Sequence, residues 1–305
     1  MRPSRADAES GRVVVIGDAL IDEMRDADGS RDFVGGAALN VAVGLAVLGV
    51  PTTLLAMVGD DDAGRMIRDH LADHGVQLIS SDAPLGSARA VSDRTDGEPR
   101  YEFNDSARAR RFPLDGAAAT AIDTAPIVVV SCFPFDDADH VEDLIAAVGN
   151  AERRVIVDPN PRAGMMRDRA AFLANFTRFA AGSLLAKVGD EDAELLLGDS
   201  VDAFARRLID AGASSVLATA GSRGAEVRLP DGESVAVGIA TLPGPVVDTM
   251  GAGDATLAAT VRRVVRTGLP STTTQWRELL DDAMLVAAAT CRAEGALLRL
   301  PPSAS

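Results

Sequence analysis

Short apolar runs, rich in β-branched residues, alternate along this chain with longer segments whose apolar positions recur every three or four residues. The short runs have the length of strands, and the longer segments have the period of amphipathic helices. Several runs are apolar nearly throughout, which is typical of strands covered on both faces. The pattern predicts an α/β fold with a doubly wound, mostly parallel central sheet and helices on both faces. The predicted strands are residues 12–16, 52–57, 127–131, 154–157 and 215–219.

One stretch departs from this alternation. Residues 87–92 and 99–104 flank a polar segment, and they are predicted to form a β-hairpin with its turn near Asp96 and Gly97. Together with the polar residues before Gly35, they predict a small β lid formed by about 24–35 and 86–106. An exposed lid strand can pair with a second copy across a two-fold axis, so a homodimer through the lid is expected.

The rest of the chain shows no internal repeat, low-complexity tract or long linker. We therefore expect a single domain over residues 12–303, preceded by a flexible polar tail at residues 1–11 that lacks the apolar segment of a signal peptide. The longest apolar run, residues 41–50, has about half of the ~20 residues needed to cross a bilayer. These features predict a cytoplasmic protein with no membrane partner.

Composition adds one exclusion. The chain has 305 residues, of which 47% are hydrophobic and 25% charged, as in ordinary globular proteins. Its 30 Lys and Arg against 45 Asp and Glu give a net charge of −15, and such a field repels nucleic acid. Nucleic acid is therefore not expected as a partner. The two cysteines, Cys132 and Cys291, lie in apolar stretches and are expected to be buried free thiols.

The candidate chemistry begins with the glycine-rich residues 248–254, which precede a helical run at 255–267. Small residues let a backbone approach a ligand, and the N–H groups at a helix start favour negative charge. Asp254 has two interpretations: it caps the helix, or it takes a proton from a hydroxyl that attacks a phosphoryl group. Spacing leaves both open. No Walker A loop or Rossmann glycine motif is present in the sequence.

A second glycine-rich segment, residues 35–40, opens an apolar helix that continues through Leu48. Asn40 falls one turn inside that helix, where its amide needs a partner: a bound polyol or a group in the core. Both alternatives are open. Asp22 is placed at the carboxyl end of the first strand, where open α/β sheets bind ligands.

Together these two segments resemble the two signatures of the ribokinase-like (PfkB-type) carbohydrate kinases. Residues 13–22, 58–61, 158–162, 219–224 and 295–296 follow the order and spacing of that family, so the resemblance spans about residues 12–302. It implies transfer of a phosphoryl group from ATP, with Mg²⁺, to a primary hydroxyl of a small-molecule sugar. Asp254 would be the general base, and the amides from Gly251 through Ala252 and Gly253 to Asp254 would form the anion hole.

The same resemblance implies the residues that bind the two substrates. The sugar would be held by Asp22, Gly35, Gly36, Asn40, Asn160 and Arg162. The nucleotide would be bound by Thr219, Gly221 and Gly224, with Lys187 close by.

Residues 17–22, 158–162 and 187–191 are most similar to the branch that contains fructokinase and 2-keto-3-deoxygluconate kinase. Arg162 suits both sugars, because a guanidinium pairs with a carboxylate or with a phosphate. The lid lacks the arginine expected near Asn104 for a keto acid, so fructose is the favoured substrate. A nucleoside kinase and a sugar-binding regulator without catalysis are the further alternatives.

Three departures from the family pattern concern the nucleotide and the ions. The acidic motif linked to Mg²⁺ has Gly189 in place of its asparagine, and Asp192 keeps the carboxylate that would bind the metal through water. Met284 stands where relatives carry a polar residue beside the adenine. Arg299 replaces a small residue of the loop that would hold K⁺ with Asp248, which leaves K⁺ activation in question.

Three other sets of residues are given structural interpretations. His70 and His74 are expected to end a helix on a solvated face, since no third metal ligand accompanies them. His140 is expected to begin a polar helix face, and the arginines at residues 108–111 are expected to form a solvated edge of the lid.

Overall fold

The computed structural model describes residues 12–26, 29–93, 100–149 and 154–301. The expectations for the tail at residues 1–11 and for a turn at Asp96 and Gly97 lie outside these ranges.

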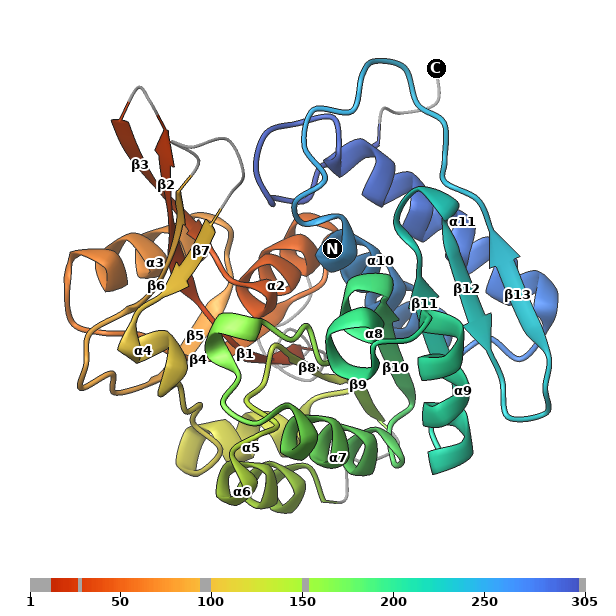
Figure 1. Ribbon diagram of the computed structural model, residues 1–305, viewed down its shortest axis with the longest axis horizontal. Helices are drawn as coiled ribbons and strands as arrows, with labels where there is room; N and C mark the ends of the chain where they lie inside the picture. Colours follow the sequence, from red (N-terminus) through yellow and green to blue (C-terminus); the bar gives the residue numbers. More distant parts are fainter. Residues whose placement is uncertain (1–11, 27–28, 94–99, 150–153, 302–305) are drawn as a thin grey trace, which may run out of the picture.

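Within the described residues, nine strands form the central sheet in the order β13-β12-β11-β10-β9-β8-β1-β4-β5 (Figure 1). The seven strands from β11 to β5 run parallel, and β12 and β13 add an antiparallel edge. Their bounds are β1 (Val13–Gly17), β4 (Thr52–Met57), β5 (Gln77–Ser81), β8 (Val128–Ser131), β9 (Val155–Asp158), β10 (Leu185–Gly189), β11 (Val216–Thr219), β12 (Ala225–Arg228) and β13 (Ser234–Val237).

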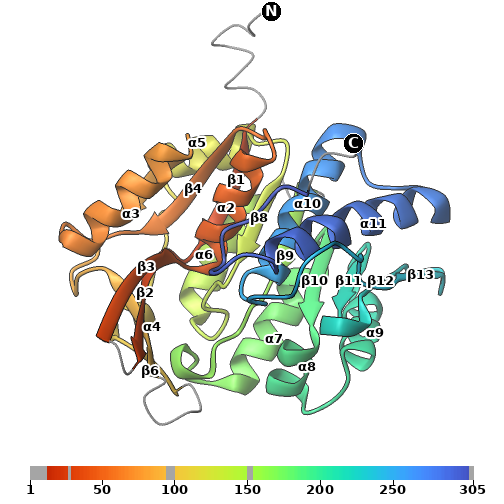
Figure 2. The same ribbon diagram turned by 90° about the horizontal axis from the view of Figure 1, so that it is seen from above.

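Helices cover both faces of this sheet (Figures 1 and 2). Val13 and Val15 of β1 belong to one hydrophobic core and Val14 and Ile16 to the other, which is why the strand is apolar throughout. The first core is built with α2 (Ala37–Val47), α3 (Asp62–Asp73), α10 (Ala252–Thr267) and α11 (Thr273–Thr290). The second is built with α5 (Gly116–Thr124), α6 (Ala138–Val148), α7 (Arg169–Ala180), α8 (Asp190–Leu197) and α9 (Val201–Ala211). The predicted fold class is confirmed.

A separate small sheet projects from the body in the order β3-β2-β6-β7 (Figure 1). It contains β2 (Leu20–Asp26), β3 (Gly29–Gly35), β6 (Ala88–Asp93) and β7 (Arg100–Phe103). The antiparallel pairing of β6 with β7 matches the predicted hairpin strands. One expectation is corrected: Asp22 does not follow the first strand of the central sheet, because β1 ends at Gly17 and Asp22 lies within β2.

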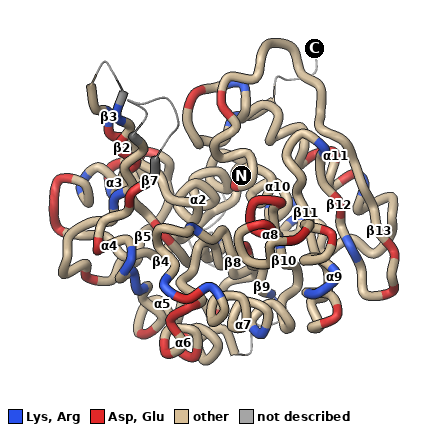
Figure 3. The backbone as a smooth tube through the Cα atoms, in the orientation of Figure 1, with Lys and Arg blue, Asp and Glu red and all other residues tan. Residues whose placement is uncertain are grey.

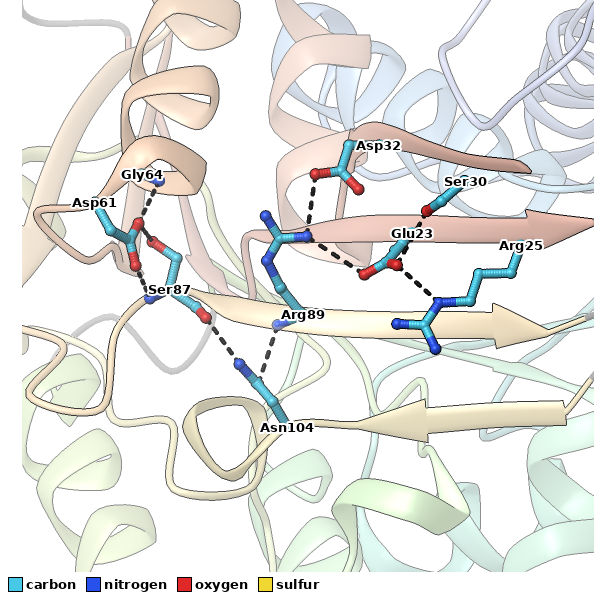
Figure 4. A network of polar contacts seen from close by, with 9 residues as sticks. All are labelled: Glu23, Arg25, Ser30, Asp32, Asp61, Gly64, Ser87, Arg89 and Asn104. Carbon is cyan, nitrogen blue, oxygen red and sulfur yellow. Dashed lines mark hydrogen bonds and ion pairs between the residues drawn. The ribbon is translucent and has the colours of Figure 1, made fainter.

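Hydrogen bonds fix the base of the small sheet to the body (Figure 4). The Asp61 carboxylate, which caps α3, accepts hydrogen bonds from the amide and the hydroxyl of Ser87 at 2.8 and 2.6 Å. The side-chain amide of Asn104, at the end of β7, donates to the Ser87 carbonyl at 3.0 Å, and its oxygen accepts the amide of Arg89 at 3.0 Å. These bonds join the start of β6 to the end of β7 and tie this end of the pair to the start of α3 through Ser87.

Two interpretations of polar residues are wrong. His140 is 3% exposed rather than solvated, and its Nε2 accepts the Phe112 amide at 3.0 Å. Among the arginines at residues 108–111, Arg108 and Arg111 are exposed as predicted, but Arg110 is buried and donates to the carbonyl oxygens of Cys132 and Ala107 at 3.3 and 3.1 Å. In both cases a hydrogen bond from a distant segment satisfies the buried polar group, and local periodicity does not report such bonds.

The remaining structural expectations fare better. His70 lies in the last turn of α3 and His74 at its C-cap, as predicted. Cys132 is a buried free thiol, whereas Cys291 is half-buried. Among the helices that the structure describes, none has both the length and the apolar character needed to span a bilayer.

Candidate active site

The site lies where the direction of the chain through the sheet reverses. Within the central sheet, β4 and β5 lie on one side of β1, and the later strands β8, β9 and β10 lie on its other side. Open α/β sheets bind ligands outside the carboxyl ends of their strands at such a point. Gly17 and Ser131 end the two central strands side by side, and a Cβ on Gly17 would lie 1.9 Å from the Ser131 carbonyl oxygen.

The helix α10 begins directly above this point. Its N-cap, Gly251, has φ +76°, and a Cβ there would lie 2.3 Å from the Ala296 carbonyl oxygen, so only glycine fits. The amide of Ala252 donates to the Thr249 carbonyl at 3.2 Å and is therefore already engaged. Gly253 and Asp254 follow in the same first turn, where a helix supplies no carbonyl for its amides. These amides can receive a negative group.

The Asp254 side chain does not cap its helix, because the N-cap is Gly251 and no side chain caps there. Its carboxylate is 8% exposed and accepts hydrogen bonds from Asn40 Nδ2 at 2.9 Å and from Asn160 Nδ2 at 3.5 Å. Burial raises the pKa of Asp254 to about 7, although the Asn40 hydrogen bond and the positive charge of Lys187 act to lower it. A base poised near neutral pH suits proton transfer from a hydroxyl.

A buried ion pair lies beside this carboxylate. Lys187 Nζ, on β10, contacts Asp158 Oδ2, at the end of β9, at 2.8 Å, and both side chains are buried. Burial acts to lower the pKa of Lys187, but the facing Asp158 carboxylate raises it above its ordinary value, so the lysine is charged. A Cβ placed on Gly253 would lie 3.2 Å from Lys187 Nζ, which brings the ammonium against the first turn of α10.

On the side of the small sheet, the predicted sugar residues also lie close together. A Cβ on Gly35 would lie 2.1 Å from Asp22 Oδ2, so glycine is needed where β3 passes the aspartate. Burial raises the pKa of Asp22 to about 7, and the nearby Asp18 raises it further. Gly36, with φ +108°, is the N-cap of α2. Arg162 is exposed, and its Nη1 donates to the Pro161 carbonyl at 3.3 Å.

Asp18 is a site residue to which the sequence analysis gave no role. It is buried, its Oδ1 accepts the Ala38 amide at 3.0 Å, and its carbonyl accepts the Leu39 amide at 3.1 Å. The carboxylate thus holds the start of α2, which carries Asn40. Its position directly after the first strand was the available signal, since polar groups at strand ends face the ligand crevice.

The predicted nucleotide residues gather at the ends of two adjacent strands. Thr219 ends β11 in register with Gly189 of β10, and its hydroxyl donates to the Val188 carbonyl at 3.4 Å. Gly221 and Gly224 bracket the turn that follows, with φ +50° and +96°. A Cβ on Gly224 would lie 2.1 Å from the Val237 carbonyl oxygen, so this turn is tightly packed on β13.

A groove of about 960 Å³ lies next to this turn. Its wall on α8 contains Asp190, Glu191 and Glu194, and Asp199 and Asp202 continue the acidic lining. Figure 3 shows acidic residues along the backbone at α8. A triphosphate is disfavoured there, because like charges repel. The amides of the first turn of α10, with Lys187 beside them, offer the better place for phosphate.

The two residues predicted to bind ions have internal partners. Asp192 Oδ2 accepts the Gly189 amide at 2.7 Å, which leaves Oδ1 for a metal-bound water, and burial raises the pKa of Asp192 to about 6. Asp248 accepts the amides of Met250 and Gly295 at 2.9 and 3.1 Å. In the described ranges, no three His, Cys, Asp or Glu side chains form a group that could hold a metal ion. The chemistry fits a metal that arrives with the nucleotide and keeps several waters.

Two further residues at which the chain departs from the family pattern differ in burial. Met284 is buried on α11 in the core beneath the sheet. Arg299 is exposed, and its amide donates to the Thr290 hydroxyl at 3.1 Å.

Comparisons with known proteins identify the family and the fold. The model of the pfkB family carbohydrate kinases matches residues 11–302. A fructokinase of Rhizobium leguminosarum bv. trifolii is 30% identical over 256 residues, covering 79% of this chain and 76% of the relative, and a fructokinase of Klebsiella pneumoniae is 28% identical over 300 residues, covering 96% and 97%. The crystal structure of aminoimidazole riboside kinase from Salmonella enterica, complexed with aminoimidazole riboside and an ATP analogue, superposes with a TM-score of 0.75 at 25% identity, covering 94% of this chain and 95% of that chain.

This chain belongs to the pfkB family of carbohydrate kinases. The family resemblance drawn from the sequence is confirmed, and with it the ribokinase-like fold. ATP and a divalent metal ion are the cofactors that this family implies.

Proposed function

We propose that this protein is a fructokinase, which transfers the γ-phosphoryl group of ATP to a primary hydroxyl of fructose. The observation that carries the proposal is the Asp254 carboxylate. It is buried in the first turn of α10, next to amides that favour an anion, and it accepts hydrogen bonds from Asn40 and Asn160. A general base beside an anion site is the arrangement that phosphoryl transfer to a hydroxyl needs.

The charges around the sugar side favour a neutral substrate. Asp22 and Asp18 lie there, and the guanidinium of Arg89 is already paired with Asp32 at 3.0 Å and with Glu23 at 3.6 Å (Figure 4). The carboxylate of 2-keto-3-deoxygluconate would be repelled by these acids, and among the proposed sugar-binding residues Arg162 alone carries a positive charge to offset them. The hydroxyls of fructose can instead donate hydrogen bonds to the aspartates. The names of the two curated relatives support the same choice.

In the proposed reaction, the sugar is bound by Asp22, Gly35, Gly36, Asn40, Asn160 and Arg162, and the nucleotide by Lys187, Thr219, Gly221 and Gly224. Asp254 takes the proton of the attacking hydroxyl, and the amides of Gly253 and Asp254 stabilise the charge on the transferring phosphoryl group. Mg²⁺ bound with ATP neutralises phosphate oxygens, and Asp192 is its proposed contact through water. A K⁺ site at Asp248 stays a prediction, as does a cytoplasmic location.

The small sheet is the proposed lid. It projects beside the sugar residues, and closing it over the sugar would exclude water from the transferring phosphate (Figure 1). Residues of β3 from Gly29 to Phe33 are exposed, and β3 is an edge strand, so the same sheet is the proposed interface of a homodimer.

The test is an ADP-release assay with Mg·ATP on the full chain. The panel contains fructose, 2-keto-3-deoxygluconate, ribose, aminoimidazole riboside and adenosine. Wild-type protein is expected to phosphorylate fructose with the highest kcat/KM, and Asp254→Asn is expected to lower kcat by about 10²-fold or more. Asp69→Asn, on the exposed face of α3, is the matched control and should retain activity.

Each other result has a defined meaning. Preference for a nucleoside would show that the protein is a nucleoside kinase instead of a fructokinase. Preference for the keto acid would show that it is a 2-keto-3-deoxygluconate kinase. Sugar binding without ATP binding in calorimetry would indicate the non-catalytic regulator. Full activity of Asp254→Asn would remove Asp254 from its role.

A further inference from the structure

We infer that Asp158 is a positioning residue: one buried carboxylate holds the Lys187 ammonium against the Gly253 turn and holds Asn160 against Asp254. The inference rests on the proposed function, because it names which residues align the base and the anion-binding turn for phosphoryl transfer. Asp158 itself does not touch the base.

Three bonds fix Asp158 at the end of β9. Its side chain is 0% exposed, and Oδ2 accepts Lys187 Nζ at 2.8 Å. Oδ1 accepts the backbone amide of Asn160 at 3.2 Å, and the Asp158 carbonyl accepts the Cys132 amide from the end of β8 at 3.2 Å. One residue therefore links the ends of β8 and β9 to the middle of β10 beneath the site.

The first consequence concerns Lys187 and α10. A Cβ on Gly253 would meet Lys187 Nζ at 3.2 Å and Cε at 3.8 Å. Glycine at this position therefore leaves room for the ammonium as well as for a ligand above the turn. Paired to Asp158, the ammonium cannot turn away from the helix start, and it adds positive charge where the phosphoryl group transfers.

The second consequence concerns Asn160. Its φ of +36° lies in the left-handed region, which non-glycine residues rarely adopt. The bond from its amide to Asp158 Oδ1 is the local contact by which an aspartate stabilises a tight turn two residues on. In this conformation Asn160 Nδ2 faces Asp254 Oδ1 at 3.5 Å.

Stability does not explain the pair. Taking two charges out of water costs about as much as their attraction returns, and apolar residues of the same volume often serve equally well. The ammonium and the turn that the pair holds both face Asp254, which is the group that the chemistry needs in place. Alignment of the site is therefore the role that the contacts support.

Charges on several elements face Asp254, and they determine in which direction the pH profile should shift in each variant. Lys187 on β10 and Arg162 after β9 lower its pKa, and Asp158 raises it. Asp192 on α8 also faces Lys187 and Arg162, and Asn40 on α2 donates a hydrogen bond to the base. Removing the Asp158 charge should therefore move the acid limb of the pH profile to lower pH, and removing the Lys187 charge should move it to higher pH.

The experiment compares Asp158→Asn, Lys187→Met and the double variant with wild type. It measures kcat, KM for sugar and pH profiles on whichever sugar of the panel wild type phosphorylates. Both single variants are expected to lose about 10-fold or more in kcat, the scale of small misplacements, with a smaller change in KM for the sugar. Their acid limbs should shift in the opposite directions given above. Glu142→Gln removes the carboxylate of the exposed ion pair with Arg178. It is the control and should leave kcat, KM and the pH profile unchanged.

The double variant keeps the test valid if a single variant does not fold, because it removes both buried charges together. It is expected to fold, to keep its acid limb near that of wild type, and to remain about 10-fold or more below wild type in kcat. Wild-type kcat in the double variant, or single variants whose acid limbs do not move, would overturn the inference. A wild-type protein that phosphorylates a sugar other than fructose would contradict the proposed substrate and leave this comparison intact.

Discussion

Asn40 and Asp254, 214 residues apart in the chain, are joined by a 2.9 Å hydrogen bond from Nδ2 to Oδ2. The bond connects α2, which carries the first glycine-rich segment, to α10, which carries the second, and the two helices pack directly on each other. It answers both questions left open by the sequence: Asn40 finds its partner within the site, and the Asp254 carboxylate faces that partner instead of capping its helix.

Replacing Asn40 by alanine should raise the pKa of Asp254, because the hydrogen bond from Asn40 acts to lower it. The acid limb of kcat against pH is expected to move to higher pH, and kcat at pH 7 should fall by up to about 10-fold. Asn175→Ala is the comparison, since Asn175 Nδ2 donates to the Phe135 carbonyl at 2.8 Å away from the site. That variant should lose stability but keep the wild-type pH profile. An unmoved acid limb in Asn40→Ala would contradict the role given to the bond.

The pH profile of the wild-type protein should show an acid limb near pH 7. Asp254 acts as a base only when it is deprotonated, and burial raises its pKa to about 7, so kcat is expected to fall as the pH is lowered through 7. Steady-state rates from pH 5.5 to 9 with saturating sugar and Mg·ATP test this. An acid limb near pH 4 would mean that the site is solvated during turnover.

The raised pKa of Asp254 increases kcat as the pH rises through 7, but it decreases the stability of the folded protein over the same range. Folded Asp254 holds its proton more tightly than the unfolded chain does, so its contribution to the free energy of unfolding falls as the pH rises from about 4 through 7. Asp254→Asn should therefore raise the thermal midpoint at pH 8 relative to wild type, while it lowers kcat by about 10²-fold or more.

Gly251→Ala should lower stability and kcat by more than backbone strain alone would explain. Gly251 and Gly268 both have φ +76°, with ψ 0° at Gly251 and 176° at Gly268, and an alanine in either conformation is strained by about 1–3 kcal/mol. Only at Gly251 would the new Cβ lie 2.3 Å from the Ala296 carbonyl oxygen; at Gly268 nothing lies within 4 Å. Gly268→Ala should lose that stability and keep its kcat. Gly251→Ala should lose more stability and about 10²-fold in kcat, and equal effects at the two positions would refute the steric argument.

His140 should make the fold sensitive to acid. Burial lowers the pKa of His140 to about 4, so the folded protein keeps the ring neutral while the unfolded chain protonates it near pH 6.5. Stability from this group is therefore present above pH 6.5 and is lost as the pH falls from 6.5 to 4. His140→Gln keeps an acceptor for the Phe112 amide and does not titrate. Urea midpoints at pH 7 and pH 5 should differ less for this variant than for wild type.

Periodicity was a reliable guide where a strand is buried on both faces by apolar residues alone. The strand at residues 52–57 has the predicted bounds, and the other predicted strands of the central sheet begin one residue later than predicted and end at most one residue later. Periodicity was a poor guide where polar residues interrupt the pattern. The strand β10 was not predicted, because Lys187 stands in its middle and is tolerated there only through its ion pair with Asp158.

The two glycine-rich segments, and with them the family and the candidate base, were determined by the sequence alone, since their chemistry resides in consecutive residues. Which groups meet was decided by the tertiary structure. Asn40 reaches Asp254 because α2 packs on α10, and Lys187 reaches Asp158 because β9 and β10 are adjacent in the sheet. Asp22 faces Gly35 because the chain leaves the central sheet to form the β2–β3 pair. Local periodicity describes how a segment distributes its own side chains, whereas these contacts depend on which segments become neighbours, and that is settled only when the whole core is buried.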